Sequence, residues 1–189
     1  MQDSVTFDAK TAMEAYRTAF EQGCSEFLKR YPETELYAPV RYLMALGGKR
    51  LRPVLVMAAC EASGGRPEEA LPAALAVELF HNFTLMHDDI MDDAPLRRGM
   101  PTVHEKWDNN TAILSGDALH VMACEALLDA PDKALPDLLR TYHRTALEVC
   151  EGQEQDMAFE SRREVTIEEY MEMIRLKTSV LLAAALDMG

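Results

Sequence analysis

Hydrophobic residues recur at helical spacing along almost the whole chain, and no segment shows the alternating pattern of a strand. One stripe runs from Tyr16 to Leu28 and stops before Pro32. Proline favours the start of a helix and glycine its end, so these residues mark most other boundaries. The predicted helices lie at residues 16–28, 39–46, 53–63, 67–93, 111–130, 132–161 and 166–188. Short connections between them predict an antiparallel all-α bundle in one domain, residues 1–189.

The composition narrows the classes of function. The chain has 189 residues, which suffices for one domain with a substantial core. Its net charge of −13 argues against binding to nucleic acid or to an anionic membrane surface. The N-terminus is polar, and no apolar stretch of about 18 residues could span a bilayer. Four cysteines without CxxC spacing favour reduced thiols. We therefore expect a soluble, cytoplasmic protein without stable membrane insertion.

The segment LMHDDIMDDAPLRRG, residues 85–99, concentrates charge at the end of a predicted apolar helix. Asp88 and Asp92 are four residues apart and therefore share one helix face. Two carboxylates on one face suit Mg²⁺, which takes oxygen ligands and is often completed by substrate phosphates. The alternative is a solvated acidic helix end, but carboxylates are unfavourable at a helix C-terminus. This segment therefore predicts a Mg²⁺ site.

Two basic clusters accompany the acidic segment. Arg97 and Arg98 follow the helix end, where they could bind a phosphate through bidentate hydrogen bonds. Lys49, Arg50 and Arg52 lie on a glycine turn just before another predicted helix. Either cluster alone would more often be a solvated turn. With the metal-ligand pair, they indicate two phosphorylated ligands, one bound through metal and one directly by cations.

These motifs together resemble those of the trans-isoprenyl diphosphate synthases, the polyprenyl synthetase family. The resembling segments are GGKRLRP at 47–53, DDxxD at 88–92, PLRRGxPT at 95–102, ILSGDAL at 113–119, EGQEQD at 151–156 and LKT at 176–178. The resemblance covers essentially the whole chain. It implies an all-helical homodimer of isoprenoid synthase type that uses Mg²⁺ to join isopentenyl diphosphate to an allylic diphosphate.

The resemblance also implies roles for individual residues. The Mg²⁺ ligands would be Asp88 and Asp92, with Asp89 in support. The contacts to isopentenyl diphosphate would be Lys49, Arg52, His81 and Arg98. Arg97 would contact the allylic diphosphate, and the allylic cavity would be lined by Gln153, Asp156, Lys177 and Thr178. The expected catalytic groups are therefore Asp88, Asp92, Arg97, Lys177 and Thr178.

Two residues that precede the acidic motif, Phe83 and Thr84, bear on the length of the product. Phe83 and Thr84 stand five and four residues before Asp88. A bulky aromatic residue there resembles synthases of short products, which favours about fifteen to twenty carbons and geranylgeranyl diphosphate slightly. The alternative interpretation is that Phe83 only packs in the core.

Alternative interpretations remain for several residues and for the whole chain. His81 could be a core histidine, and we interpret His87, His104, His120 and His143 as structural. The pair His87 and Asp88 could instead belong to a metal-dependent phosphohydrolase. The sequence also shows no second DDxxD, a motif that the family carries on a later helix. We therefore expect the N-terminal part of a longer synthase, inactive alone, or a non-catalytic subunit of a hetero-oligomeric prenyl synthase.

Overall fold

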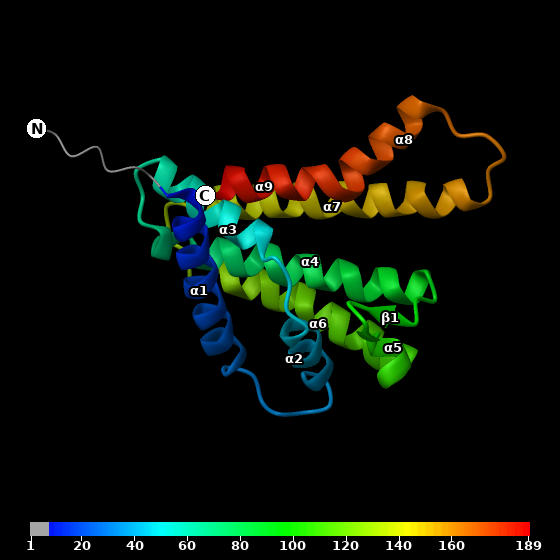
Figure 1. Cartoon of the computed structure of the whole chain (residues 1–189), viewed down its shortest axis with the longest axis horizontal. Coiled ribbons are helices and arrows are strands. Elements are labelled where there is room, and N and C mark those ends of the chain that lie inside the picture. The colour runs from blue at the N-terminus through cyan, green and yellow to red at the C-terminus, as the bar shows by residue number, and fades with distance from the viewer. Residues whose placement is uncertain (1–7) are drawn as a thin grey trace, which may run out of the picture.

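A computed structural model describes residues 8–189, and almost all of its regular structure is helical (Figure 1). The α-helices are α1 (Ala9–Leu28), α2 (Ala38–Ala45), α3 (Leu51–Ala62), α4 (Leu71–Met91), α5 (Val103–Lys106), α6 (Asn109–Leu127), α7 (Leu135–Glu160), α8 (Ile167–Ile174) and α9 (Val180–Met188). The other elements are the 3-10 turn η1 (Pro67–Ala70), the π-helical turn η2 (Arg175–Ser179) and the strands β1 (Leu96–Arg97) and β2 (Met100–Pro101). Among residues 8–189, no helix combines the length and apolar composition needed to cross a bilayer. The predicted all-α fold is confirmed.

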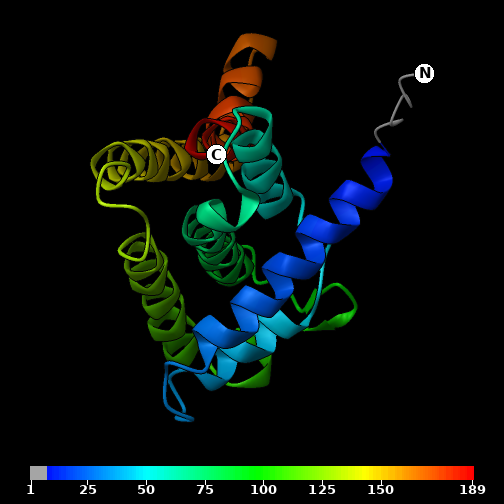
Figure 2. The same cartoon turned by 90° about the vertical axis from the view of Figure 1, so that its left-hand side faces the viewer.

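Helix α4 is the central element of the core, with α1, α3 and α6 arranged around it (Figure 2). Along α4, the side chains of Ala74, Ala76 and Leu79 are completely buried. Small side chains let neighbouring helices approach closely, and α6 contributes the completely buried Ala123 and Ala126 to this contact. Packing on several sides therefore fixes the position of α4.

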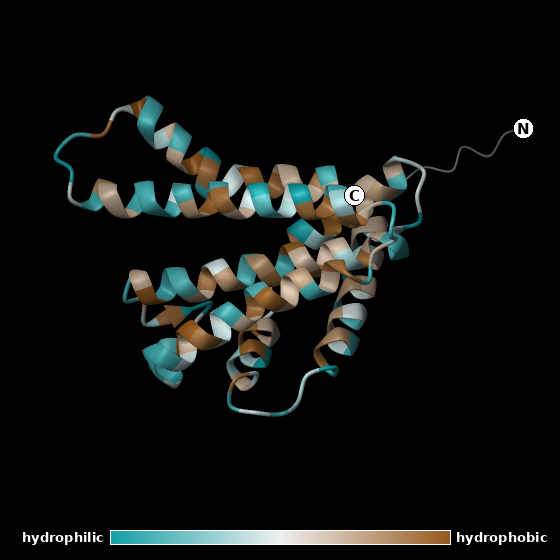
Figure 3. Ribbon diagram, turned by 180° about the vertical axis from the view of Figure 1, so that it is seen from behind, coloured by the Kyte–Doolittle hydropathy of each residue, from teal (hydrophilic) through white to brown (hydrophobic). Residues whose placement is uncertain are grey.

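Hydrophilic and hydrophobic residues alternate along α7, as expected of an amphipathic helix (Figure 3).

Two helices start later than predicted, and a proline explains each delay. We expected a helix from Pro67, but this residue begins η1, and α4 starts only at Leu71. Pro72 lacks an N–H and is tolerated only in the first turn of a helix. The start predicted near Asp132 moves to Leu135 for the same reason, because Pro136 lies in the first turn of α7.

The expectation that the chain contains no strand is also wrong in one small place. Strands β1 and β2 pair antiparallel around a turn at Arg98 and Gly99. The φ angles of these two residues are 54° and 79°, and positive φ at both central positions is typical of a type I′ turn. This hairpin follows the acidic segment directly and sets the positions of Arg97 and Arg98.

The single helix predicted for residues 166–188 is interrupted. Its start is confirmed, because Thr166 and Glu169 form the expected capping box at the beginning of α8. The regular helix ends at Ile174, and η2 separates α8 from α9. Single π-helical turns inside α-helices are frequent at functional sites, and η2 contains Lys177 and Thr178.

Arg50 is part of the core, whereas the sequence had placed it among the phosphate-binding cations. Its side chain is 2% exposed and pairs with Glu78 of α4 at 2.8 Å and with Glu21 of α1 at 2.9 Å. It also donates a hydrogen bond to the carbonyl oxygen of Met44 at 2.6 Å. These partners occupy the guanidinium, so Arg50 joins three helices and is not available to a ligand.

Replacing Glu78 with Gln should lower the free energy of unfolding by about 3 kcal/mol, because the buried charge of Arg50 would lose a partner. Urea denaturation would measure this change. The matched control is Asp137→Asn, which breaks an exposed pair with Arg140 and should cost less than about 1 kcal/mol. Equal effects of the two substitutions would contradict the role given to Arg50.

Candidate active site

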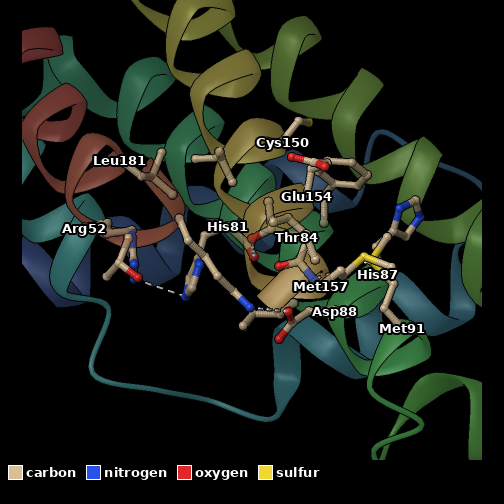
Figure 4. Close-up of a pocket in the computed structure, with 17 residues that line it drawn as sticks. Arg52, His81, Thr84, His87, Asp88, Met91, Cys150, Glu154, Met157 and Leu181 are labelled. Atoms are coloured by element: carbon tan, nitrogen blue, oxygen red, sulfur yellow. Dashed lines mark hydrogen bonds and ion pairs between the residues drawn. The ribbon is translucent and has the colours of Figure 1, made fainter. Parts of the chain in front are cut away.

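A cavity of about 650 Å³ lies between α4 on one side and α7, η2 and α9 on the other. Many of the predicted site residues line it together: Arg52, His81, Phe83, Thr84, Asp88, Gln153, Lys177 and Thr178. In the close-up, Arg52 and His81 lie toward one end and His87 and Met91 toward the other, with Asp88 between them (Figure 4). The structure thus gathers into one cavity residues that are up to 126 positions apart in the sequence, from Arg52 to Thr178.

The acidic end of the cavity is built at the C-terminus of α4. Asp88 lies in the last turn of this helix and Asp92 is its C-cap. The Lys177 ammonium lies 3.0 Å from Asp88 Oδ1 and 2.5 Å from Asp156 Oδ2, so it joins both carboxylates. Burial opposes the charge of Lys177, but its hydrogen bonds to Asp156 and Asp88 raise its pKa above the usual value.

The surroundings of Asp92 disfavour the negative charge of its carboxylate. Partial burial raises the pKa of its carboxyl, and the neighbouring charge of Asp88 raises it further. Asp156 and Glu160 act in the same direction, whereas only Lys177 opposes them among the principal causes. A bound cation would relieve this repulsion.

Asp89 does not face an open position. Its carboxylate is 4% exposed and accepts two hydrogen bonds from Arg97, at 2.8 Å from Nε and 2.6 Å from Nη2. This bidentate pair raises the pKa of Arg97 and fixes the plane of its guanidinium. The same guanidinium lies 3.8 Å from Asp88 Oδ2. Asp89 therefore supports the acidic end by orienting Arg97.

The cationic end lies where α3 meets α4. Arg52 Nη1 is 3.1 Å from His81 Nε2, and Arg52 Nε is buried with no hydrogen-bond partner within residues 8–189. Burial lowers the pKa of His81 to about 3, and the charges of Arg52, Arg98, Arg97 and Arg50 contribute. His81 is therefore neutral at physiological pH. An excess of positive charge without carboxylate partners is the setting that an anionic ligand requires.

Arg98 and the glycine turn are in contact. A Cβ placed on Gly48, whose φ is 150°, would lie 3.0 Å from Arg98 Nη1. This backbone conformation favours glycine, and Arg98 lies directly beside the residue that precedes Lys49. Lys49 itself is exposed. Burial lowers the pKa of Arg98, and the charge of Arg50 adds to this effect.

An aromatic cluster forms the wall around Phe83. Its ring stacks on His120 at 5.0 Å between centroids and meets the edge of His87 at 4.6 Å. The hydroxyl of Thr84 donates a hydrogen bond to the carbonyl oxygen of His81 at 2.8 Å. The remaining part of the Thr84 side chain is its methyl group. His120 therefore supports Phe83 by stacking on its ring, while His87 contacts Phe83 and lines the cavity with it.

Gly152 is a functional position that the sequence reasoning missed. A Cβ on this residue would lie 2.3 Å from the backbone nitrogen of Lys177 and 2.8 Å from the backbone carbon of Leu176. The missing side chain thus lets η2 rest directly on α7 and brings Lys177 to Asp88. A signal was present, because glycine inside a long helix costs about 1 kcal/mol relative to alanine.

Comparison with known proteins gives consistent results. A family model described as polyprenyl synthetase matches residues 33–189. The geranylgeranyl diphosphate synthase of Methanosarcina mazei is 52% identical over 157 residues, which are 82% of this chain and 48% of that protein. The geranylfarnesyl diphosphate synthase of Natronomonas pharaonis is 41% identical over 194 residues, covering 93% and 57% of the two chains.

Solved structures agree with these relatives. A crystal structure of geranylgeranyl pyrophosphate synthase superimposes with a TM-score of 0.91 at 49% identity, over 93% of this chain and 54% of that chain. The expected all-α fold of isoprenoid synthase type is thereby confirmed. This chain spans about half the length of the relatives it matches.

Replacing Gly152 with Ala should destabilise the protein by about 1–3 kcal/mol, because the added methyl group would collide with backbone atoms of η2. The matched control is Gly23→Ala in α1, where the methyl group would meet only the rotatable end of the Leu71 side chain. Gly23→Ala should be nearly neutral or stabilising. Thermal and urea denaturation would measure both. A Gly152→Ala protein as stable as Gly23→Ala would show that η2 does not depend on this contact.

Inorganic pyrophosphate, added with a chelator to remove metal, should raise the pKa of His81 from about 3, because an anion would offset the surrounding arginines. Without pyrophosphate, the unfolded state binds this proton first, so stability should fall as pH decreases from about 6.5 toward the folded pKa. NMR titration of the His81 imidazole would measure the shift. A pKa that stays constant at saturating pyrophosphate would exclude an anion site beside His81.

Proposed function

The chain belongs to the polyprenyl synthetase family, and from this premise we propose that it carries the substrate site of a Mg²⁺-dependent prenyltransferase. The reaction condenses isopentenyl diphosphate with an allylic diphosphate to a short-chain product of about fifteen to twenty carbons. One observation carries the proposal: a single cavity is lined both by Asp88 of the acidic motif and by Arg52, a cation with no carboxylate partner among residues 8–189. Such a cavity suits two diphosphates that are bound by different means.

The donor set of the acidic end fits Mg²⁺. Asp88 and Asp92 offer hard oxygen ligands, and burial and the charge of Asp88 raise the pKa of Asp92, an effect that a bound cation would oppose. Asp88, which lines the cavity, and Asp92, the C-cap of α4 beside it, would hold the metal, while Asp89 would act through Arg97. When bound, Mg²⁺ would stabilise the negative charge that develops on the leaving diphosphate.

The residues of the acidic end would also act on the leaving group directly. As the allylic carbon–oxygen bond breaks, Arg97 and Lys177 would donate hydrogen bonds to the departing diphosphate oxygens. Thr178 and Gln153 line the cavity next to them. Apolar side chains from both walls, among them Leu85 of α4, Met157 of α7 and Leu181 of α9, would exclude water that could quench the allylic cation.

The cationic end would hold the second substrate. Arg52, His81, Arg98 and Lys49 would bind the diphosphate of isopentenyl diphosphate, with Arg52 Nε as a donor that now lacks a partner. The carbon–carbon double bond of this substrate would attack the allylic cation and form the new bond. The resulting cation would lose a proton, which pyrophosphate is thought to accept in this family.

The length of the product would be set by the part of the cavity wall that contains Phe83 and Thr84. Phe83 and His87 line the cavity and His120 stacks on Phe83, so a growing chain would meet an aromatic cluster there. Thr84 is small and would leave space beside it. The names of the relatives, a geranylgeranyl and a geranylfarnesyl diphosphate synthase, support a product in the short-chain class.

Cytoplasmic localisation and a homodimer complete the proposal. Support for the dimer comes from α6, where apolar side chains are exposed at Ile113, Leu114 and Val121. Their exposures are 42%, 58% and 65%, and such a patch on one helix favours association.

Release of pyrophosphate tests the proposed function and separates it from the alternatives. With isopentenyl and an allylic diphosphate present, a full-length synthase that contains this chain should release pyrophosphate together with a lengthened isoprenyl diphosphate. Pyrophosphate or phosphate released without isopentenyl diphosphate would favour a metal-dependent phosphohydrolase. Substrate binding without release by the full-length protein would favour a non-catalytic subunit.

Replacing Asp88 with Asn should weaken the Mg²⁺-dependent binding of an allylic diphosphate at least about tenfold, because one of two metal ligands would lose its charge. Calorimetry with and without Mg²⁺ would measure this. Asp132→Asn, in the exposed segment before α7, should leave binding unchanged. Binding to the Asp88→Asn protein that stays as strong and as metal-dependent would contradict the assignment.

Replacing Phe83 with Ser should shift the preference toward longer chains, because the aromatic wall would open. Binding of geranylgeranyl diphosphate should strengthen relative to farnesyl diphosphate, and any product made should lengthen. Phe159→Ser, at the far end of α7, is the matched control and should change neither. If Phe83→Ser and the control behave alike, Phe83 is only a packing residue.

A further inference from the structure

A second group of metal-ligating side chains lies just beyond the acidic motif, outside the lining of the cavity. Asp93, His104 and Glu105 each offer a ligand atom, and these atoms lie within 4.8 Å of one another. The β1–β2 hairpin brings the three residues together. Thr102 ties its two ends by donating hydrogen bonds from Oγ1 to the carbonyl oxygen of Ala94 at 2.7 Å and from its backbone nitrogen to Pro95 at 3.2 Å.

His104 is the unusual member of this group. The residue is 8% exposed, and neither Nδ1 nor Nε2 has a hydrogen-bond partner within residues 8–189. Its Nε2 lies 3.8 Å from Glu105 Oε1. A buried imidazole normally has at least one nitrogen engaged. Here a ring nitrogen lies within 4.8 Å of carboxylate oxygens of Asp93 and Glu105, and neither carboxylate hydrogen-bonds to it.

We propose that Asp93, His104 and Glu105 form a binding site for a divalent transition-metal ion, with Zn²⁺ as the best fit. One imidazole and two carboxylates are a ligand set that Zn²⁺ accepts, with a fourth position left for water. Mg²⁺ prefers oxygen ligands only, so the imidazole distinguishes this site from the pair Asp88 and Asp92.

The geometry needs only a small adjustment to close around the ion. Metal–ligand distances of about 2.1 Å in a tetrahedral site place ligand atoms about 3.4 Å apart. The ligand atoms here lie within 4.8 Å, and Asp93 and Glu105 are exposed side chains that can close the difference. His104 is buried, so its imidazole would stay in place while the two carboxylates move toward the ion.

The site would act on the segment that carries two arginines of the cavity. Asp93 precedes β1, and His104 and Glu105 follow β2, so an ion on these three residues fastens both ends of the hairpin. Arg97 and Arg98 lie between those ends. Zn²⁺ bound here would therefore stabilise the position of both guanidinium groups without touching a substrate.

The experiment uses Co²⁺ as a spectroscopic substitute for Zn²⁺, added to the whole chain in excess Mg²⁺ so that Asp88 and Asp92 are occupied. The visible absorption of Co²⁺ would be followed during titration, and the NMR signals of His104 would be followed during a parallel Zn²⁺ titration. Wild-type protein should bind one ion with a shift of the His104 signals. Glu105→Gln should weaken binding at least about tenfold, and His104→Asn should abolish it.

The matched control is His143→Asn, an exposed histidine on α7 that lies outside this group. This variant should bind Co²⁺ as the wild type does. His104 signals that do not respond to saturating Zn²⁺ would overturn the proposal, as would Glu105→Gln with wild-type affinity. Both of these measurements remain decisive if the buried substitution His104→Asn prevents folding.

Discussion

A buried guanidinium is stable only when acceptors surround it, and Arg50 imposes this demand on the rest of the fold. Its acceptors come from α1, from the end of α2 and from α4, so the turn before α3 is drawn against the middle of α4. Arg52 follows two residues later and reaches His81, which lies about one helical turn beyond Glu78. The ion pair that holds the core together thus also places the cationic end of the cavity.

Helix α4 sets the spacing between two opposite surpluses of charge. His81 and Asp88 are seven residues apart, which corresponds to about 10 Å along a helix. Burial and nearby arginines depress the pKa of His81 at one point, and burial and nearby carboxylates raise the pKa of Asp92 near the other. Two diphosphates repel each other, so they can share a cavity only if each meets its own counter-charge. A rigid, buried helix keeps those counter-charges apart.

The sequence predicted the helices and the separation of acidic and basic clusters, because both depend on local spacing. It could not separate Arg50 from Arg52, since only the packed structure shows that Glu21 and Glu78 surround one of them. Nor could it separate Asp89 from Asp88, because the hairpin that presents Arg97 to Asp89 is defined by backbone φ angles at Arg98 and Gly99. Pro72 and Pro136 did carry a usable signal, since each limits where a helix can start.

The π-helical turn η2 places the Lys177 ammonium beside carboxylates of the acidic end. Lys177 pairs with Asp88 at 3.0 Å and with Asp156 at 2.5 Å, whereas Asp92 has no cationic partner within 4 Å among the described residues. Under the proposed function, a diphosphate would compete for Lys177 and free Asp88 for a metal ion. Metal and diphosphate would then bind tightly only together, because each removes a charge that opposes the other.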